Sequence, residues 1–129
     1  MIEQFFDQSS SSFTYLVSSS KHNACIIDPV KENNEIYIQY LDQHQLNLSC
    51  ILETHTHADH VTGSGALIDM YGCKTFCGMV SNNGNIETLH DGQEILLDDL
   101  NIQAIYTPGH TDDSYSCLLY TSPSPRDIS

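Results

Sequence analysis

The stretch His55-Thr56-His57-Ala58-Asp59-His60 decides how this chain is interpreted, because it places three histidines and one carboxylate within six residues. Imidazole and carboxylate side chains together suit zinc, iron or manganese. Two histidines separated by one residue on a loop can point at the same ion, while the Asp and His that follow can face a neighbouring ion or orient the ligands. The stretch therefore predicts a metal site that keeps open coordination positions, as catalysis requires.

A second element, Thr107-Pro108-Gly109-His110-Thr111, places another histidine in a Pro-Gly turn downstream. A compact ligand cluster and a distant lone histidine are how a chain builds one metal site from two loops. Asp59 is the expected catalytic residue. The expected metal ligands are His55, His57, Asp59, His60 and His110.

Other polar residues are expected to be structural. Asp28 lies directly before a proline; it could support the metal site, but the interpretation favoured here is a turn-forming aspartate. Gly63 and Gly65 would permit either close approach of a substrate or tight packing of the helix that follows, and both interpretations stay open. Three isolated histidines are expected in the core or on the surface: His22, His44 and His90.

Composition limits the class of protein. The 129 residues give room for one domain. Four Lys and Arg against seventeen Asp and Glu give a net charge of −13, which excludes a phosphate-tracking surface for nucleic acid. The first residues lack the pattern of a signal peptide, and no stretch is long and apolar enough to span a membrane. The five cysteines are odd in number and are expected to be reduced core thiols of a cytoplasmic protein.

The hydrophobic pattern alternates between strands and helices. Strands are predicted at 1–6, 13–17, 24–27, 49–52 and 74–77, and a pair at 94–97 and 100–106. A helix at about 32–44 should bury Ile36, Tyr37, Tyr40 and Leu41. A second helix, with Ala66, Leu67, Met70 and Tyr71 on its apolar face, should end at Gly72. This order predicts an α/β layered fold.

The tail from Cys117 to Asp127 differs in character from the rest of the chain. Its peptide, Cys-Leu-Leu-Tyr-Thr-Ser-Pro-Ser-Pro-Arg-Asp, is encoded by the transposon mosaic-end adapter of tagmentation sequencing libraries. We therefore expect 1–116 to be the N-terminal part of one domain and 117–129 to be a non-native, adapter-derived tail. On this expectation the natural protein continues beyond Ser116.

The pattern His-x-His-x-Asp-His, with the downstream Gly109-His110, resembles the signature of the metallo-β-lactamase superfamily. Within it, the chain is similar to the persulfide dioxygenase (sulfur dioxygenase) branch. The similarity extends over 1–116. It is carried mainly by Ala58 and by Val61-Thr62-Gly63-Ser64-Gly65, with support from Phe5-Phe6-Asp7, from 11–16 and from Ile27-Asp28-Pro29-Val30.

The resemblance implies an αββα sandwich, of which only about the first half is present, with the metal at one edge of its two sheets. It also implies one iron(II) ion held by His55, His110 and an Asp from a later Gly-Asp element. Asp112 and Asp113 are too close to His110 to be that Asp, so we expect the chain as given to be an inactive fragment. The implied reaction oxidises glutathione persulfide to sulfite with dioxygen, and His57, Asp59 and His60 would orient the ligands or water.

The alternative is a thioester hydrolase of the glyoxalase II type with two zinc ions. There His55, His57 and His110 would hold one ion, and Asp59 and His60 the other. A third interpretation is a truncated fold without catalysis. The partner in either enzyme is a small thiol compound rather than nucleic acid or membrane, and a homodimer is left open.

Overall fold

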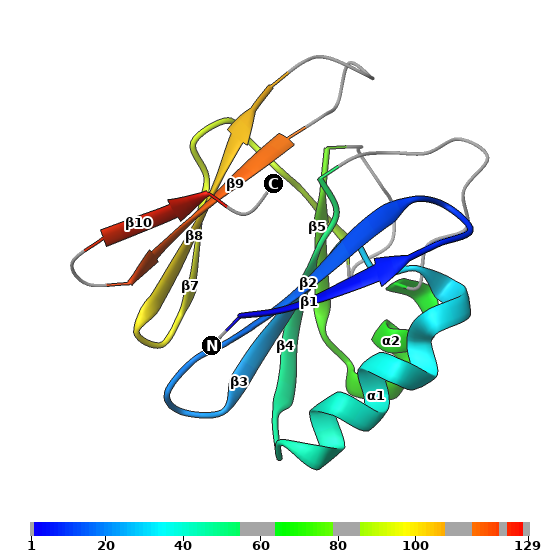
Figure 1. Ribbon diagram of the computed structural model, residues 1–129. Coiled ribbons are helices and arrows are strands. Elements are labelled where there is room, and N and C mark those ends of the chain that lie inside the picture. Colours follow the sequence, from blue (N-terminus) through cyan, green and yellow to red (C-terminus); the bar gives the residue numbers. More distant parts are fainter. Residues whose placement is uncertain (1, 55–63, 79–85, 108–114, 122–123, 128–129) are drawn as a thin grey trace.

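Two β-sheets and one layer of helices make up the computed structural model, which describes residues 2–54, 64–78, 86–107, 115–121 and 124–127 (Figure 1). The larger sheet has the strand order β1-β2-β3-β4-β5-β6 and the smaller one β10-β9-β8-β7. The strands are β1 (Ile2–Asp7), β2 (Ser12–Ser18), β3 (Asn23–Ile27), β4 (Asn47–Leu52), β5 (Lys74–Cys77), β6 (Ile86–Thr88), β7 (Glu94–Leu97), β8 (Leu100–Tyr106), β9 (Tyr115–Thr121) and β10 (Ser124–Asp127). The helices are η1 (Lys31–Asn33), α1 (Asn34–Gln43) and α2 (Ser64–Tyr71).

The six-stranded sheet changes from antiparallel to parallel at β3. Strands β1, β2 and β3 pair antiparallel, whereas β3, β4, β5 and β6 pair parallel. Parallel neighbours need a crossover connection, and α1 and α2 lie in the connections after β3 and β4. Both helices cover the same face of the sheet (Figure 1). Residues such as Leu16, Ile26, Ile51, Leu41 and Leu67 form the apolar cluster between this face and the helices.

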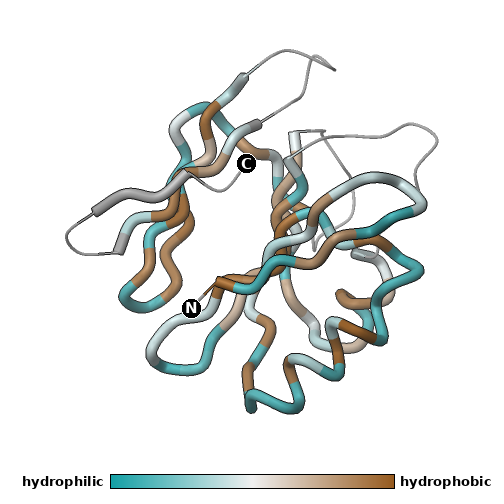
Figure 2. Tube along the Cα trace, viewed as in Figure 1, coloured by the Kyte–Doolittle hydropathy of each residue, from teal (hydrophilic) through white to brown (hydrophobic). Residues whose placement is uncertain are grey.

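The opposite face of the six-stranded sheet packs on the four-stranded sheet. Val17, Ile27 and Leu52 from the first sheet share one buried cluster with Ile102 and Leu119 from the second. Strand β8 alternates buried and half-buried residues along most of its length, which is the pattern of a strand with one covered face. Figure 2 shows hydrophobic residues concentrated in the strands and hydrophilic ones in the turns.

The outer face of the four-stranded sheet carries no helix within the described parts of the chain. Leu96, which points to that side, is 73% exposed. The layers therefore run helix, sheet, sheet, which is the first three layers of the αββα sandwich that the sequence led us to expect. Neither α1 nor α2 has the length and apolar character needed to cross a membrane, and the described residues contain no other α-helix.

Two details of the helices differ from the sequence prediction. The helix predicted at 32–44 is a short 3₁₀ turn followed by α1, and it buries Tyr37 and Leu41 while Ile36 is 51% exposed. In α2 the buried face is formed by Leu67 and Ile68, and Met70 is 61% exposed. The spacing rules identified both helices but misplaced part of each buried face, since Ile36 in α1 and both Ala66 and Met70 in α2 are exposed.

The predicted end of α2 is confirmed. Gly72 has φ +65°, and its N–H donates to the Ile68 carbonyl at 2.7 Å. This left-handed residue directly after the helix is a common C-terminal cap. The turn predicted between β7 and β8 is also confirmed, with Asp98 at φ +55°. Strand β6 was not predicted, because Ile86–Thr88 is only three residues long.

Strand β9 pairs with β8 from Tyr115 to Thr121, so Cys117 and Leu119 are buried between the sheets. Strand β10 pairs with β9 over Ser124–Asp127. These pairings describe where 117–121 and 124–127 lie. The adapter origin of 117–129 concerns the gene sequence, so it stays a prediction.

Candidate functional site

The predicted metal ligands fall on two segments outside the described residues. His55, His57, Asp59 and His60 belong to 55–63, and His110 belongs to 108–114. Among the residues that the structure describes, no three His, Cys, Asp or Glu side chains gather as a metal-binding group. The ligand set therefore stays a prediction, and the structure informs on the elements that lead into both segments.

The first segment starts from the end of β4, in the middle of the six-stranded sheet. Beyond Leu52, the chain stays attached to both neighbouring strands. The Leu52 carbonyl accepts the Asp28 N–H at 2.8 Å, and the Glu53 N–H donates to the Phe76 carbonyl at 2.9 Å. Thr54 follows and is completely buried. The residue directly before His55 is thus held by the sheet rather than by a free loop.

Asp28 fixes Thr54 through its carboxylate. The Thr54 N–H donates to Asp28 Oδ1 at 2.7 Å, and the Thr54 hydroxyl donates to Asp28 Oδ2. Asp28 adopts φ +58°, in the left-handed region that non-glycine residues rarely use. The favoured interpretation of Asp28 as a turn residue is therefore incomplete, and the alternative of a support near the site agrees better with its contacts, because its carboxylate anchors the residue that leads into the histidine cluster. The spacing of Asp28 and Thr54 in the sequence gives no sign of this contact.

Buried hydroxyl groups lie behind Asp28, on the side of the helices. The Thr14 hydroxyl donates to the Asp28 carbonyl at 2.7 Å and lies 3.0 Å from the Tyr37 hydroxyl. Tyr37 Oη also accepts the Val30 N–H at 3.1 Å. Thr14 and Tyr37 are both almost completely buried. Sequence reasoning treated both as ordinary strand and helix residues.

The second segment leaves from the end of β8. Tyr106 is paired with Tyr115 of β9, and its N–H donates to Asp91 Oδ1 at 2.8 Å. Thr107 Oγ1 lies 3.0 Å from Ser116 Oγ, in an exposed position. The C-terminal ends of β4 and β8 lie at the same edge of the sandwich (Figure 1). The two segments that carry the predicted ligands therefore start from one edge, which is the arrangement that a two-loop metal site needs.

Helix α2 begins directly after the first segment, and its first residue Ser64 is buried. A Cβ atom built on Gly65 would meet no atom within 4 Å. Tight helix packing therefore does not require glycine at this position. Gly63 lies outside the described residues.

The isolated histidines lie on the surface or make structural contacts, as expected. His44 stacks on Tyr40 with ring centroids 4.0 Å apart and its Nδ1 lies 2.9 Å from the Tyr40 carbonyl. His22 and His90 are exposed.

The cysteines are free thiols, and all except the half-buried Cys77 are buried. Cys25 and Cys50 are partners in the register of β3 and β4. A hydrogen bond with Cys50, then burial, raise the pKa of the Cys25 thiol well above its usual value. Thiols in this state are small apolar core residues rather than nucleophiles.

The chain resembles two kinds of enzyme to a similar degree. It is 33% identical over 121 residues to the human persulfide dioxygenase ETHE1, covering 92% of this chain and 48% of that protein. It is 31% identical over 118 residues to the hydroxyacylglutathione hydrolase of Francisella tularensis subsp. novicida, covering 90% of this chain and 45% of that protein. The chain thus spans about half the length of these curated relatives.

Solved structures match the fold closely. ETHE1 from Myxococcus xanthus superimposes with a TM-score of 0.84 at 36% identity, covering 92% of this chain and 53% of the other. A metallo-beta-lactamase from Staphylococcus aureus gives 0.82 at 26% identity, covering 93% and 38%. The sequence model of the metallo-beta-lactamase superfamily matches residues 9–82, which include the Asp28 turn, the 55–60 cluster and α2. The chain therefore belongs to the metallo-beta-lactamase superfamily.

Proposed function

We propose that this chain belongs to a metal-dependent enzyme that acts on a glutathione-derived sulfur compound, and that the reaction is persulfide oxidation. In that reaction glutathione persulfide, dioxygen and water give glutathione and sulfite. The observation that carries the proposal is the edge of the sandwich where β4 and β8 end, because each strand leads directly into predicted ligands. The relatives named persulfide dioxygenase and the matching ETHE1 structure support it.

The donor set suits a metal by its chemistry. Neutral imidazole and carboxylate are ligands of iron(II) and zinc(II). In the proposal, His55 and His110 hold iron with a carboxylate from a later element, and His57, Asp59 and His60 orient ligands or water. Bound iron would supply the redox chemistry with dioxygen. The chain itself supplies a rigid support, because Asp28 and the sheet hold Thr54 directly before the first ligand.

The second candidate function is hydrolysis of a glutathione thioester. The similar identity to the hydroxyacylglutathione hydrolase favours it. In this case the five residues would bind two zinc ions, with His55, His57 and His110 at one ion and Asp59 and His60 at the other. A metal-activated water would be the nucleophile.

One pair of assays distinguishes the two functions. Protein carrying the native gene sequence in place of 117–129 is loaded separately with iron(II) and zinc(II). Oxygen consumption is measured with glutathione persulfide, and thiol release is measured with a glutathione thioester. We expect iron-dependent oxygen consumption. Thioester cleavage with zinc and no oxygen consumption with iron would establish the hydrolase instead.

The proposed metal ligands can be tested separately from activity, by measuring bound metal in histidine variants. His55→Ala and His110→Ala should lose stoichiometric metal measured by elemental analysis. His22→Asn removes an exposed histidine whose carbonyl accepts the Asn47 N–H at the start of β4, the opposite end of that strand from His55, and should retain the metal. Equal metal content in all three variants would contradict the proposed ligands.

We also propose that 117–129 derives from a sequencing adapter and that the given chain is inactive because it lacks the carboxylate ligand. The nucleotide sequence across codon 116 tests the first statement, since codons that differ from the adapter would refute it. Tight, stoichiometric iron binding by the 129-residue chain would refute the second.

A further inference from the structure

The turn Asp28-Pro29-Val30 connects β3 to the helix layer, and its backbone polar groups are bonded on both sides. The Asp28 N–H donates to the Leu52 carbonyl at 2.8 Å. The Asp28 carbonyl accepts from the Thr14 hydroxyl, and the Val30 N–H donates to Tyr37 Oη. Pro29 has no N–H to satisfy. The hydroxyls of Thr14 and Tyr37 thus hold the turn from the helix side, while β4 holds it from the other.

This turn needs such support because Asp28 is in an unfavourable conformation. Its φ of +58° crowds the side chain against the backbone. A residue before proline is further restricted by the proline ring. Conformations of this kind persist where the surroundings determine them from several directions. The same residue presents both carboxylate oxygens to Thr54. Any relaxation of the Asp28 backbone would therefore move the acceptors of Thr54.

The direction of each hydrogen bond follows from counting protons. The Thr14 hydroxyl has one proton, and it is donated to the Asp28 carbonyl at 2.7 Å. The Tyr37 hydroxyl must therefore donate to Thr14 Oγ1 across 3.0 Å. Its oxygen accepts the Val30 N–H at the same time. The Tyr37 hydroxyl therefore holds this turn both as a hydrogen-bond donor and as an acceptor.

We infer that Tyr37 is a positioning residue: its hydroxyl, through Thr14 and the backbone of Asp28, fixes Thr54 and hence the start of the predicted metal-binding segment. The relevance to metal binding rests on the proposed function, whereas the coupling from Tyr37 to Thr54 does not. The residue acts from α1, in the helix layer, and needs no contact with metal or substrate.

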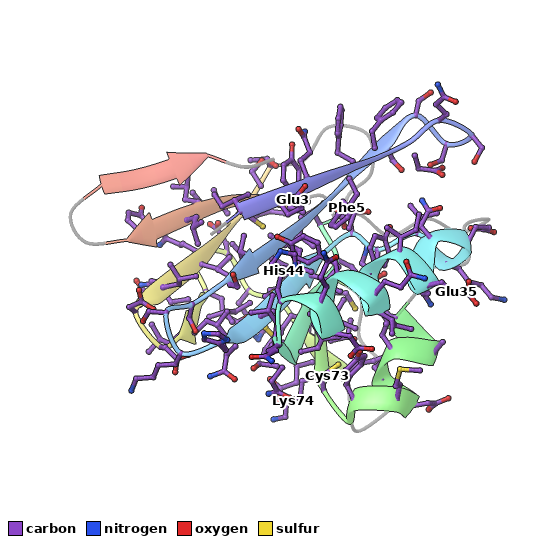
Figure 3. All side chains as sticks on the ribbon, turned by 60° about the horizontal axis from the view of Figure 1, so that its bottom comes forward. Glu3, Phe5, Glu35, His44, Cys73 and Lys74 are labelled. Atoms are coloured by element: carbon purple, nitrogen blue, oxygen red, sulfur yellow. The ribbon has the colours of Figure 1, made fainter. Side chains whose placement is uncertain are left out.

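Tyr37→Phe isolates this role because the ring keeps its packing. The ring of Tyr37 meets Phe5 edge-on with centroids 5.4 Å apart. Tyr40 provides a matched control on the same helix, since its ring also meets Phe5 edge-on at 5.6 Å. Burial, and then the carboxylate of Glu3, raise the pKa of the Tyr40 hydroxyl, which therefore lies toward β1. Figure 3 shows Glu3 and Phe5 on β1 next to α1.

The test is hydrogen–deuterium exchange by NMR on the metal-free 129-residue chain. The amide of Thr54 reports its bond to Asp28 Oδ1. The amide of Ala104, which donates to the Gln93 carbonyl at 2.8 Å in the other sheet, reports global opening. Losing one hydrogen bond should accelerate Thr54 exchange by about two- to tenfold relative to Ala104 in Tyr37→Phe. Tyr40→Phe should leave the ratio of the two rates unchanged.

Thr14 gives an independent test from β2 in case Tyr37→Phe does not fold. Thr14→Val removes the hydroxyl at constant shape and should accelerate Thr54 exchange to a similar extent. Thr14→Ser restores the hydroxyl and should return the ratio toward that of the unmodified chain. The inference would be overturned if the ratio of the Thr54 to the Ala104 exchange rate stayed unchanged in Tyr37→Phe or Thr14→Val. It would also be overturned if Tyr40→Phe raised this ratio to the same extent.

A second measurement separates this inference from the proposed function. Zinc affinity, measured by chelator competition on protein with the native sequence after Ser116, should fall in Tyr37→Phe and Thr14→Val but not in Tyr40→Phe. If the unmodified protein binds no metal while the exchange result holds, the proposed function fails and the coupling stands. If metal binds and the exchange ratio does not respond, the coupling fails alone.

Discussion

The two sheets of this protein differ in how many of their faces are covered. The six-stranded sheet is packed against helices on one face and against the second sheet on the other. The four-stranded sheet is packed on its inner face, while Leu96 on its outer face is largely exposed. An apolar residue on a strand therefore has a different energetic weight in each sheet. The two strand ends that lead into the predicted ligands differ in a similar way: Thr54 after β4 is buried, whereas Tyr106 at the end of β8 is exposed.

The largest expected effect comes from truncating a side chain in the doubly covered sheet. Ile51 is completely buried against the helices, so Ile51→Ala should lower the free energy of unfolding by about 2–5 kcal/mol. Leu96→Ala, on the exposed face, should change it by less than about 0.5 kcal/mol. Urea denaturation measures both. Similar losses for the two variants would show that the four-stranded sheet is covered in solution.

The next effect compares the aspartates that hold the two strand ends. The half-buried Asp28 accepts two hydrogen bonds from the buried Thr54, so Asp28→Asn should cost about 1.5–3 kcal/mol of stability. It should also weaken metal binding by about 10–100-fold, as is typical for partners that orient ligands.

Asp91 accepts the Tyr106 N–H at 2.8 Å in an exposed position. Asp91→Asn should therefore change stability by less than about 0.5 kcal/mol. Denaturation and chelator competition are measured on both variants. A larger loss of stability in Asp91→Asn than in Asp28→Asn would contradict the expectation that Asp28 holds its strand end more strongly.

A smaller effect, of opposite sign, is expected within the six-stranded sheet. The Thr75 hydroxyl is buried and has no hydrogen-bond partner among the described residues, whereas the buried Thr54 hydroxyl is bonded to Asp28. Thr75→Val should raise the free energy of unfolding by about 1 kcal/mol, because it removes an unsatisfied polar group at constant shape. Thr54→Val should lower it. Thermal unfolding of both variants tests the pair, and a loss of stability in Thr75→Val would contradict it.

The smallest effect concerns the turns that join the two sheets at the edge opposite the predicted ligands. The Ser19 hydroxyl donates to Asp98 Oδ2, and the Asn23 side chain donates to the same oxygen at 2.8 Å. The Ser20 N–H and hydroxyl both donate to Asp99. These hydrogen bonds, from Ser19 and then Asn23, lower the pKa of Asp98 below 3.8, and those from the Ser20 N–H chiefly lower that of Asp99.

A lowered folded-state pKa means that both carboxylates stabilise the fold above about pH 3.8 and that this contribution disappears as the pH falls through their folded values. Unfolding by urea, repeated between pH 6 and pH 2 on the intact chain and on Asp98→Asn, should show a flatter acid limb in the variant. Asp7→Asn is the control within the larger sheet. Hydrogen bonds from Ser10 and then Asn33 hold the pKa of Asp7 at about 2, so its contribution should disappear as the pH falls toward 2.

Sequence periodicity identified most of the elements. The strand at 74–77 and the pair at 94–97 and 100–106 agree with the observed bounds, and Gly72 ends α2 as expected. These elements follow local rules of alternation, turn chemistry and capping. The predicted burial of Ile36 and Met70 was wrong, because both are exposed. The position of a buried helix face depends on the sheet underneath, which spacing alone does not specify.

The candidate site, too, could be predicted only in part from the sequence. Metal binding was inferred from residue types and spacing in 55–60 and 107–111. The support of that site was recognised only in part: a supporting role of Asp28 was considered but not favoured, and Thr54, Thr14 and Tyr37 share no motif with it. Their contacts join positions 14, 28, 37 and 54 through side chains. No local pattern encodes a hydrogen bond across such separations.

The sequence by itself indicated the family and most of the order of strands and helices, and it predicts the ligand chemistry, because each depends on residue type and short-range spacing. Only the tertiary structure decided that a tyrosine in the helix layer, a threonine on β2 and a left-handed aspartate together hold Thr54. The reason is physical. A buried hydroxyl must find a partner, and the partner is chosen by which strands and helices the packing brings together.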